Sequence, residues 1–109
     1  MAYQGWKNYE TWLVALWLDN DEYSYNYWRE RTQEIWEGAT ADKPFSRRDR
    51  AMLELSDTLK DEVEDAAPEL EGIFSDLLNA ALSEVDWREI ADHWLDERHT
   101  ELSDENQGD

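Results

Sequence analysis

Residues 5–20, GWKNYETWLVALWLDN, constrain the fold more than any other stretch of this chain. Asn8 is a residue type that caps helix N-termini, and the apolar residues after it recur at the three- and four-residue spacing of one helical face. Those residues are Tyr9, Trp12, Leu13, Leu16 and Trp17. We therefore predict a short helix that begins after Asn8 and buries an aromatic face in the core.

Later segments repeat this helical spacing, and none alternates apolar and polar residues as a strand does. We expect further helices over residues 21–37, from Arg47 after a Ser46 N-cap, from Pro68 to about Leu82, and from Asp86 onwards. The fourth of the five helices has the widest apolar face, and the fifth turns Trp87, Ile90, Ala91, Trp94 and Leu95 toward the core. The sequence thus predicts an all-α fold, a compact bundle of about five short helices.

A chain of 109 residues needs only one core. We assign residues 1–97 to a single helical domain and residues 98–109, whose sequence RHTELSDENQGD is polar, to a flexible acidic tail. The absence of cysteine excludes disulfides and thiolate metal sites. The sequence also has no apolar run long enough to cross a bilayer and no secretory leader, so we expect a cytoplasmic protein that avoids membranes.

The net charge of −18 excludes ordinary electrostatic binding to nucleic acid and favours a basic partner. Residues 1–56 contain ten acidic and seven basic residues, whereas residues 57–109 contain eighteen acidic and three basic ones. The cluster of Arg47, Arg48 and Arg50 opposes the dipole of the helix that it begins, so these side chains are expected to pair with acidic groups elsewhere in the fold or with a ligand.

Carboxylates on the third and fourth helices form the candidate partner-binding site. They are Asp57, Asp61, Glu62, Glu64, Asp65, Glu69, Glu71 and Asp76. From Asp57 to Asp65 a helix would rise about 13 Å and present one carboxylate per roughly 3 Å, a density similar in scale to the phosphate spacing of about 3.4 Å along one DNA strand. These side chains could therefore occupy a DNA-binding groove on another protein.

Two other interpretations of this composition stay open. Only three lysines stand against 28 acidic residues, a balance that also suits a protein kept soluble at high salt. Such a protein could be a structural or regulatory module that assembles through an aromatic patch around Trp6, Tyr23 and Tyr25. Acidic faces are also common as plain solvated surface.

Catalytic chemistry finds little support in the sequence. Glu89, His93 and Glu97 share one helical face, with Asp96 and His99 close by, and these side chains are suitable metal ligands. Their spacing matches neither H-E-x-x-H nor the paired E-x-x-H of di-metal bundles, so a solvated face with two histidines explains them better. No nucleophile elbow or phosphate-binding glycine loop occurs. We expect no metal, no cofactor and no enzymatic activity.

The segment NYETWLVALWLDN, from Asn8 to Asn20, and the segment LSEVDWREIA, from Leu82 to Ala91, carry a resemblance to a known group. Both are similar to elements of small acidic proteins of unknown function that are encoded by phages, plasmids and archaeal elements. The resemblance supplies no reaction and no catalytic residue, and it implies a mobile-element setting. In size, charge and helicity the chain is also similar in type to DNA-mimic counter-defence proteins.

Together these observations predict a stoichiometric inhibitor of the anti-restriction or anti-CRISPR type. It would bind the basic, DNA-contacting surface of a host defence complex through the carboxylates of its C-terminal half. The sequence leaves the target and the oligomeric state open, with a homodimer among the alternatives.

Overall fold

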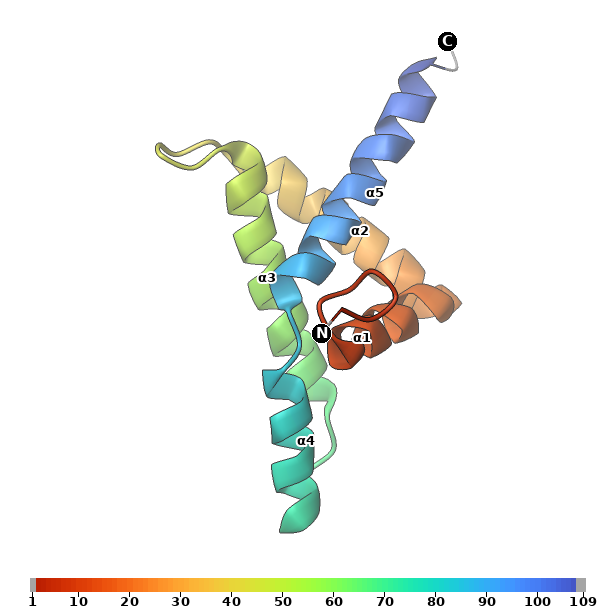
Figure 1. The fold of residues 1–109 in the computed structure, drawn as a ribbon. Coiled ribbons are helices and arrows are strands. Elements are labelled where there is room, and N and C mark those ends of the chain that lie inside the picture. Colours follow the sequence, from red (N-terminus) through yellow and green to blue (C-terminus); the bar gives the residue numbers. More distant parts are fainter. Residues whose placement is uncertain (1, 108–109) are drawn as a thin grey trace.

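The computed structural model describes the backbone of residues 2–107 and the side chains of residues 2–98. It contains α1 (Tyr9–Asn20), α2 (Glu22–Gly38), α3 (Arg47–Ala66), α4 (Ile73–Ser83) and α5 (Trp87–Gln107) (Figure 1). The predicted all-α bundle of about five helices is confirmed. No helix in the described part has both the length and the apolar character that crossing a bilayer requires.

The core forms where α5 crosses the other long helices. α5 packs against α3, α2 and α1, and α2 also contacts α1 and α3. Its residues Ile90, Trp94 and Leu95 are buried against Leu55 and Leu59 of α3. The predicted inward face of α5 is confirmed, because Trp87 and Ala91 are buried as well.

The predicted inward face of α1 is wrong. Trp17 is 70% exposed and Tyr9 is also exposed, while the buried side of α1 consists of Thr11, Ala15 and Leu18. α1 itself carries apolar residues on all of its sides, so their spacing does not define a single apolar face. The structure buries the side with the smaller residues, and the rings of Tyr9 and Trp12 instead contact Tyr3 outside the core.

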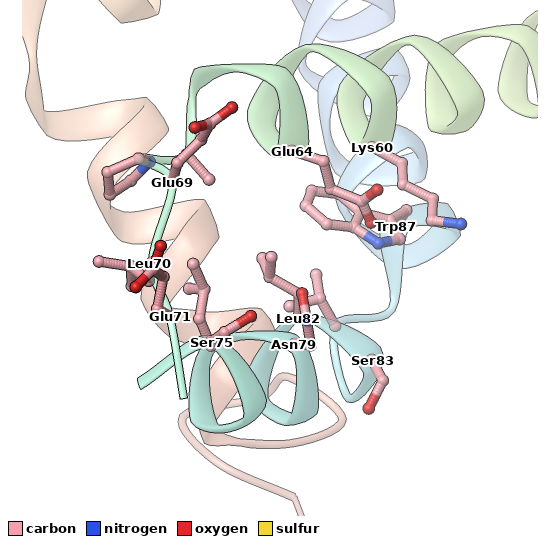
Figure 2. Close-up of a pocket in the computed structure, with 14 residues that line it drawn as sticks. Lys60, Glu64, Glu69, Leu70, Glu71, Ser75, Asn79, Leu82, Ser83 and Trp87 are labelled. Atoms are coloured by element: carbon pink, nitrogen blue, oxygen red, sulfur yellow. The ribbon is translucent and has the colours of Figure 1, made fainter. Parts of the chain in front are cut away.

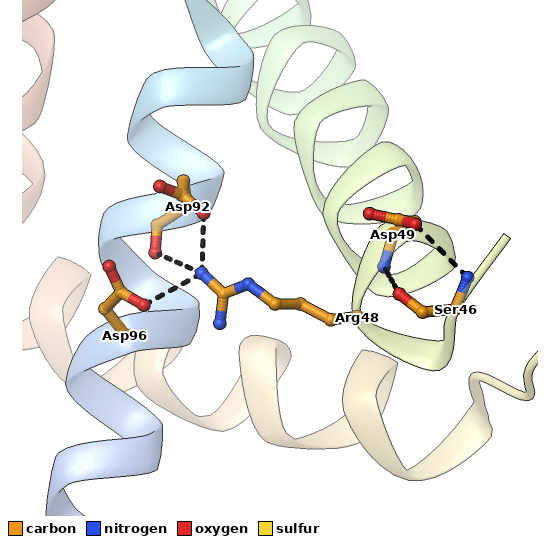
Figure 3. Close-up of polar contacts among 5 residues, drawn as sticks. All are labelled: Ser46, Arg48, Asp49, Asp92 and Asp96. Carbon is orange, nitrogen blue, oxygen red and sulfur yellow. Dashed lines mark hydrogen bonds and ion pairs between the residues drawn. The ribbon is translucent and has the colours of Figure 1, made fainter.

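The predicted starts of α1 and α3 are confirmed by their caps. The Asn8 side chain accepts a hydrogen bond from the Thr11 N–H at 2.9 Å. At the start of α3, the Ser46 hydroxyl accepts from the Asp49 N–H, and the Asp49 carboxylate accepts from the Ser46 N–H (Figure 3). These reciprocal bonds form a capping box. They fix the direction in which α3 leaves the preceding loop.

The prediction for α4 is right about its apolar face and wrong about its start and its packing. The helix begins at Ile73 rather than Pro68, because residues 67–71 are not helical and Gly72 has φ +62°, a conformation that favours glycine. A Cβ atom added at Gly72 would meet no atom within 4 Å, so no neighbouring element packs closely against this glycine. No residue of α4 is buried, and none of the main helix contacts among the described residues involves α4. The helix projects from the bundle beyond the end of α3 (Figure 1).

α5 does not end at the boundary that we drew after residue 97. The helix continues to Gln107, away from the core (Figure 1). The side chains of residues 99–109, which include His99 and most of the predicted tail, lie outside the part of the structure that is described.

Hydrogen bonds join the start of α1 to the turn between α4 and α5. The Asn8 amide donates to the carbonyl of Glu84 at 2.7 Å, and the Thr11 hydroxyl accepts from the Asp86 N–H at 2.9 Å. Asp86 in turn caps α5 by accepting from the Glu89 N–H at 3.1 Å. The N-terminal and late segments are therefore neighbours in the fold.

Candidate acidic interface

One face of α3 presents a row of carboxylates to solvent. Glu54, Asp57, Asp61 and Asp65 are all exposed and follow one another at intervals of three or four residues. The opposite side of α3 buries Ala51, Leu55 and Leu59, so helical geometry itself directs the four acids outward. We call these four residues the acidic stripe; it covers about 16 Å of helix.

The structure separates the eight residues predicted for partner binding into three groups. Asp57, Asp61, Glu62, Glu64 and Asp65 lie on α3, Glu69 and Glu71 lie in the connection before α4, and Asp76 lies on α4. All are exposed except Glu62, which is partly buried. Only Asp57, Asp61 and Asp65 belong to the acidic stripe, with Glu64 next to them on the helix surface.

Glu62 has an intramolecular role that the sequence did not reveal. Its carboxylate accepts a hydrogen bond from the Tyr27 hydroxyl and pairs with Arg31 at 3.5 Å, and both partners belong to α2. The hydrogen bond to Glu62 raises the pKa of Tyr27, with burial adding to the shift. Glu62 therefore holds α2 against α3 and is a poor candidate for binding a partner.

Glu54 is the stripe residue that our sequence reasoning missed. It precedes Asp57 by three positions and Asp61 by seven, a spacing that would have placed it on the same face. Together with Arg50, these three acids line a surface hollow of about 450 Å³, which Gly38 and the following loop residues close on the other side. The hollow is large enough for the end of a basic side chain.

The prediction that the arginine cluster at the start of α3 pairs with acidic groups elsewhere in the fold is confirmed for Arg48, whereas Arg47 contacts Trp36 instead. Arg48 pairs with Asp92 and Asp96 of α5, at 2.5 and 2.8 Å (Figure 3). Arg47 donates to the carbonyl of Trp36 at 2.7 Å and lies over its ring. These contacts tie α3 to α5 and α2, and thereby fix the orientation of the acidic stripe.

A second group of titratable side chains joins α1 to α5. His93 Nε2 lies 3.7 Å from Asp19 and 3.9 Å from Glu97, and the Tyr25 hydroxyl donates to the other oxygen of Glu97 at 2.8 Å. Asp19 raises the pKa of His93, Glu97 adds to this shift, and burial opposes it. A protonated His93 would therefore bridge the two helices.

This cluster differs from the histidine group that we expected on α5. Glu89 is not part of it, because its carboxylate accepts from the Lys7 N–H at 2.9 Å. Asp19, His93 and Glu97 each offer one ligand atom within 4.8 Å of the others, so they are the described residues that could hold a metal ion. The ion pair already accounts for their arrangement.

The three residues of the predicted aromatic patch have different surroundings. Trp6 lies edge-on to His93, with ring centroids 5.2 Å apart. Tyr25 is partly buried and contacts Trp94, whereas Tyr23 is 79% exposed. Trp6 and Tyr25 thus help to cover the core, and the three side chains do not offer an equally exposed surface.

Comparison with known proteins identifies the family. The model of DUF7249, described as a family of unknown function, matches residues 1–91. The chain belongs to DUF7249. The match covers the acidic stripe of this DUF7249 protein, α4 and the start of α5. No curated protein and no solved structure matches the chain. The family assigns no reaction, so a functional argument has to start from the surface of the chain itself.

Proposed function

We propose that this DUF7249 protein is an acidic, DNA-mimic inhibitor that binds the DNA-contacting surface of a host defence complex. The acidic stripe on α3 carries the proposal. Its four carboxylates lie about 4.5–6 Å apart along the helix axis. A protein surface that binds a row of DNA phosphates is lined with Lys and Arg, and such side chains would pair with this row of acids.

The rigidity of α3 supports this function. Its inner side is anchored by Leu55 and Leu59, and its flanks are held by Arg48 and Glu62. The carboxylates therefore project from a helix whose backbone is already ordered. Preorganisation of this kind lowers the entropic cost of association.

The hollow beside the stripe supports the same partner chemistry. Glu54, Asp57 and Asp61 line one side of it, so a Lys or Arg side chain entering the hollow would meet three carboxylates. Arg50 also lines the hollow. It would favour a partner that offers a hydrogen-bond acceptor as well as basic side chains. A basic groove with polar edges fits this description better than a uniformly basic patch.

The mobile-element resemblance favours a defence complex as the target, of the restriction or CRISPR type, in the cytoplasm of the host cell. An inhibitor of this class acts by occupying a surface and needs no catalytic residue or cofactor. DNA itself is not the partner, because the net charge of −18 opposes an approach to phosphate.

The proposal is tested by capture from host lysate on the immobilised protein, with washes of increasing salt. A stripe variant carries Glu54→Gln, Asp57→Asn, Asp61→Asn and Asp65→Asn. A matched variant neutralises four exposed acids of α2, namely Glu22, Glu30, Glu34 and Glu37. The expected result is a DNA-binding protein that the wild type and the matched variant retain and the stripe variant loses. Equal retention by all three proteins would refute the stripe as the binding site.

A salt-adapted interaction module is the second candidate, and the excess of 28 acidic over ten basic residues favours it. Such a protein gains stability as molar salt screens the repulsion among its own charges. Thermal melting across a salt series distinguishes the two functions. A DNA mimic is expected to be folded already in dilute buffer, whereas a salt-adapted protein should gain substantial stability as salt rises to the molar range.

A further inference from the structure

The outward face of α4 and the segment before it expose large apolar side chains. Ile73 is 68% exposed, Phe74 66%, Leu77 58% and Leu70 41%. Ile73, Phe74 and Leu77 belong to one helical face, since they follow the three- and four-residue spacing, whereas Leu70 lies in the non-helical segment before α4 and lines the groove toward α3. A contiguous face of this kind on a water-soluble surface marks a contact site. We call Ile73, Phe74 and Leu77 the α4 patch.

The low charge of α4 points to a second copy of the chain as the occupant. Two molecules with a net charge of −18 repel each other over most of their surfaces. Asp76 is the one charged residue among the eleven of α4. The α4 patch is therefore a surface on which two copies can approach at low electrostatic cost.

The area of the patch is sufficient for a small symmetric dimer. With roughly 150–200 Å² for a large apolar side chain, the exposed fractions leave about 350 Å² per copy. Two copies would thus bury about 700 Å² from these three residues alone. The flanking helix surface brings the total to the order of 1,000 Å², the range in which specific interfaces begin.

The helix dipoles of α4 favour an antiparallel arrangement, because it places the positive N-terminal end of each copy beside the negative C-terminal end of the other. A groove of about 990 Å³ lies between α4 and the end of α3, and Ile73, Phe74 and Leu77 do not line it. Figure 2 shows Glu69 and Glu71 toward one end of this groove and Lys60 with Glu64 toward the other. The α4 patch therefore lies outside the groove, and a two-fold pair forms each of its contacts twice.

We propose that the α4 patch is a homodimer contact in which two copies of α4 pack antiparallel about a two-fold axis near Leu77. The dimer goes beyond the proposed inhibitor function and does not depend on it. A dimer contact on α4 leaves the acidic stripe on α3 free to bind the proposed DNA-contacting surface. It also explains why an apolar helix in so acidic a chain has no buried residue within its own fold.

The mass of the protein in solution is the first test, measured by sedimentation or light scattering over a concentration series. The wild type is expected to be a dimer. Leu77→Glu should weaken dimerisation by about 100-fold or more, because it places two like charges next to the axis. Tyr23→Glu is the matched control, since it adds the same charge at an exposed aromatic residue of α2 and should leave the dimer intact.

Folding of the variant can be checked independently, because none of the three core tryptophans lies on α4. Unchanged tryptophan fluorescence, in which Trp28, Trp87 and Trp94 are the buried contributors, together with unchanged circular dichroism would show that Leu77→Glu leaves the core folded. Wild-type protein that stays monomeric throughout the series would overturn the proposal and assign the α4 patch to a different protein. A dimer that Leu77→Glu does not weaken would overturn it as well.

The absence of cysteine permits a second test, of the arrangement itself. In an antiparallel pair, Leu77→Cys lies opposite its own copy and should form a disulfide under mild oxidation. Ile73→Cys lies opposite position 81, so it should crosslink in a mixture with Ala81→Cys and should not crosslink with itself. Self-crosslinking of Ile73→Cys without the mixed product would contradict the antiparallel arrangement.

Discussion

The hydroxyl of Thr11 accepts a hydrogen bond from the backbone N–H of Asp86 at 2.9 Å, across 75 residues of sequence. The same hydroxyl donates to the Asn8 carboxamide oxygen at 2.6 Å, so it acts as both a donor and an acceptor. Thr11 is fully buried. This bond fastens the first helix of the chain to the start of the last one, and it gives the polar residues of the N-terminal segment a structural function.

Replacing Thr11 by valine should therefore destabilise the fold. Valine keeps the shape of the side chain but leaves the Asp86 N–H without its acceptor, which costs about 1–3 kcal/mol in the free energy of unfolding. Urea denaturation followed by circular dichroism measures this loss. Thr58→Val is the matched control, because the Thr58 hydroxyl bonds only to the carbonyl of Glu54 in its own helix, and it should change stability by less than about 0.5 kcal/mol. Equal losses in the two variants would contradict the role of the Thr11 bond.

The helices that could be predicted in detail are those whose local signals agree with their packing. α3 has a capping box at Ser46 and a narrow apolar side that includes Leu55 and Leu59, and both features indicate the same boundary and orientation. α1 offers no such agreement, since it is apolar on all sides. The choice of its buried side depends on how closely the small residue Ala15 can approach the rest of the core, which one sequence does not reveal.

Glu62 and Asp61 are adjacent acids with different expected roles. Glu62→Gln removes the charge that pairs with Arg31 and weakens the bond to Tyr27, so the melting temperature should fall by a few degrees. Asp61→Asn should leave the melting temperature nearly unchanged, because Asp61 is exposed on the acidic stripe. The effects on partner binding should be reversed, so that Asp61→Asn weakens binding and Glu62→Gln leaves it nearly unchanged. A stable Glu62→Gln protein with reduced binding would reverse the roles we assign.

The pair between His93 and Asp19 should make stability depend on pH. The folded-state pKa of His93 is raised above its ordinary value, so the native state binds the proton more tightly than the unfolded chain. The stabilisation is complete below pH about 6.5 and is lost as pH rises through the folded-state pKa. The difference in melting temperature between wild type and His93→Gln should thus be largest in mild acid and shrink in mild alkali.

The carboxylates around His93 provide the control for this dependence. Asp19 and Glu97 face it directly, and Asp96 adds a smaller effect from the same helix. In an Asp19→Asn background, His93→Gln should show much less pH dependence. A difference that stayed constant with pH in the wild-type background would show that His93 does not form this ion pair.

The candidate site could be predicted in outline because charge and helical spacing are both visible in a sequence. Asp57, Asp61 and Asp65 lie together as that reasoning requires. Glu62 could not be recognised as a tertiary contact, because its partner Tyr27 belongs to a helix 35 residues earlier in the chain. Glu54 was missed for a simpler reason, since it lies just before residue 57, in the half of the chain whose charge is nearly balanced.

The salt dependence of binding to the captured DNA-binding protein tests the central claim most directly. If the acidic stripe replaces DNA phosphates on a basic surface, the affinity of the wild type should fall steeply as salt rises. The stripe variant should bind more weakly and with a shallower slope, and the α2-matched variant, which has the same net charge, should follow the wild type more closely. A slope that is identical for the stripe variant and the α2-matched variant would show that net charge alone governs binding and would contradict the account.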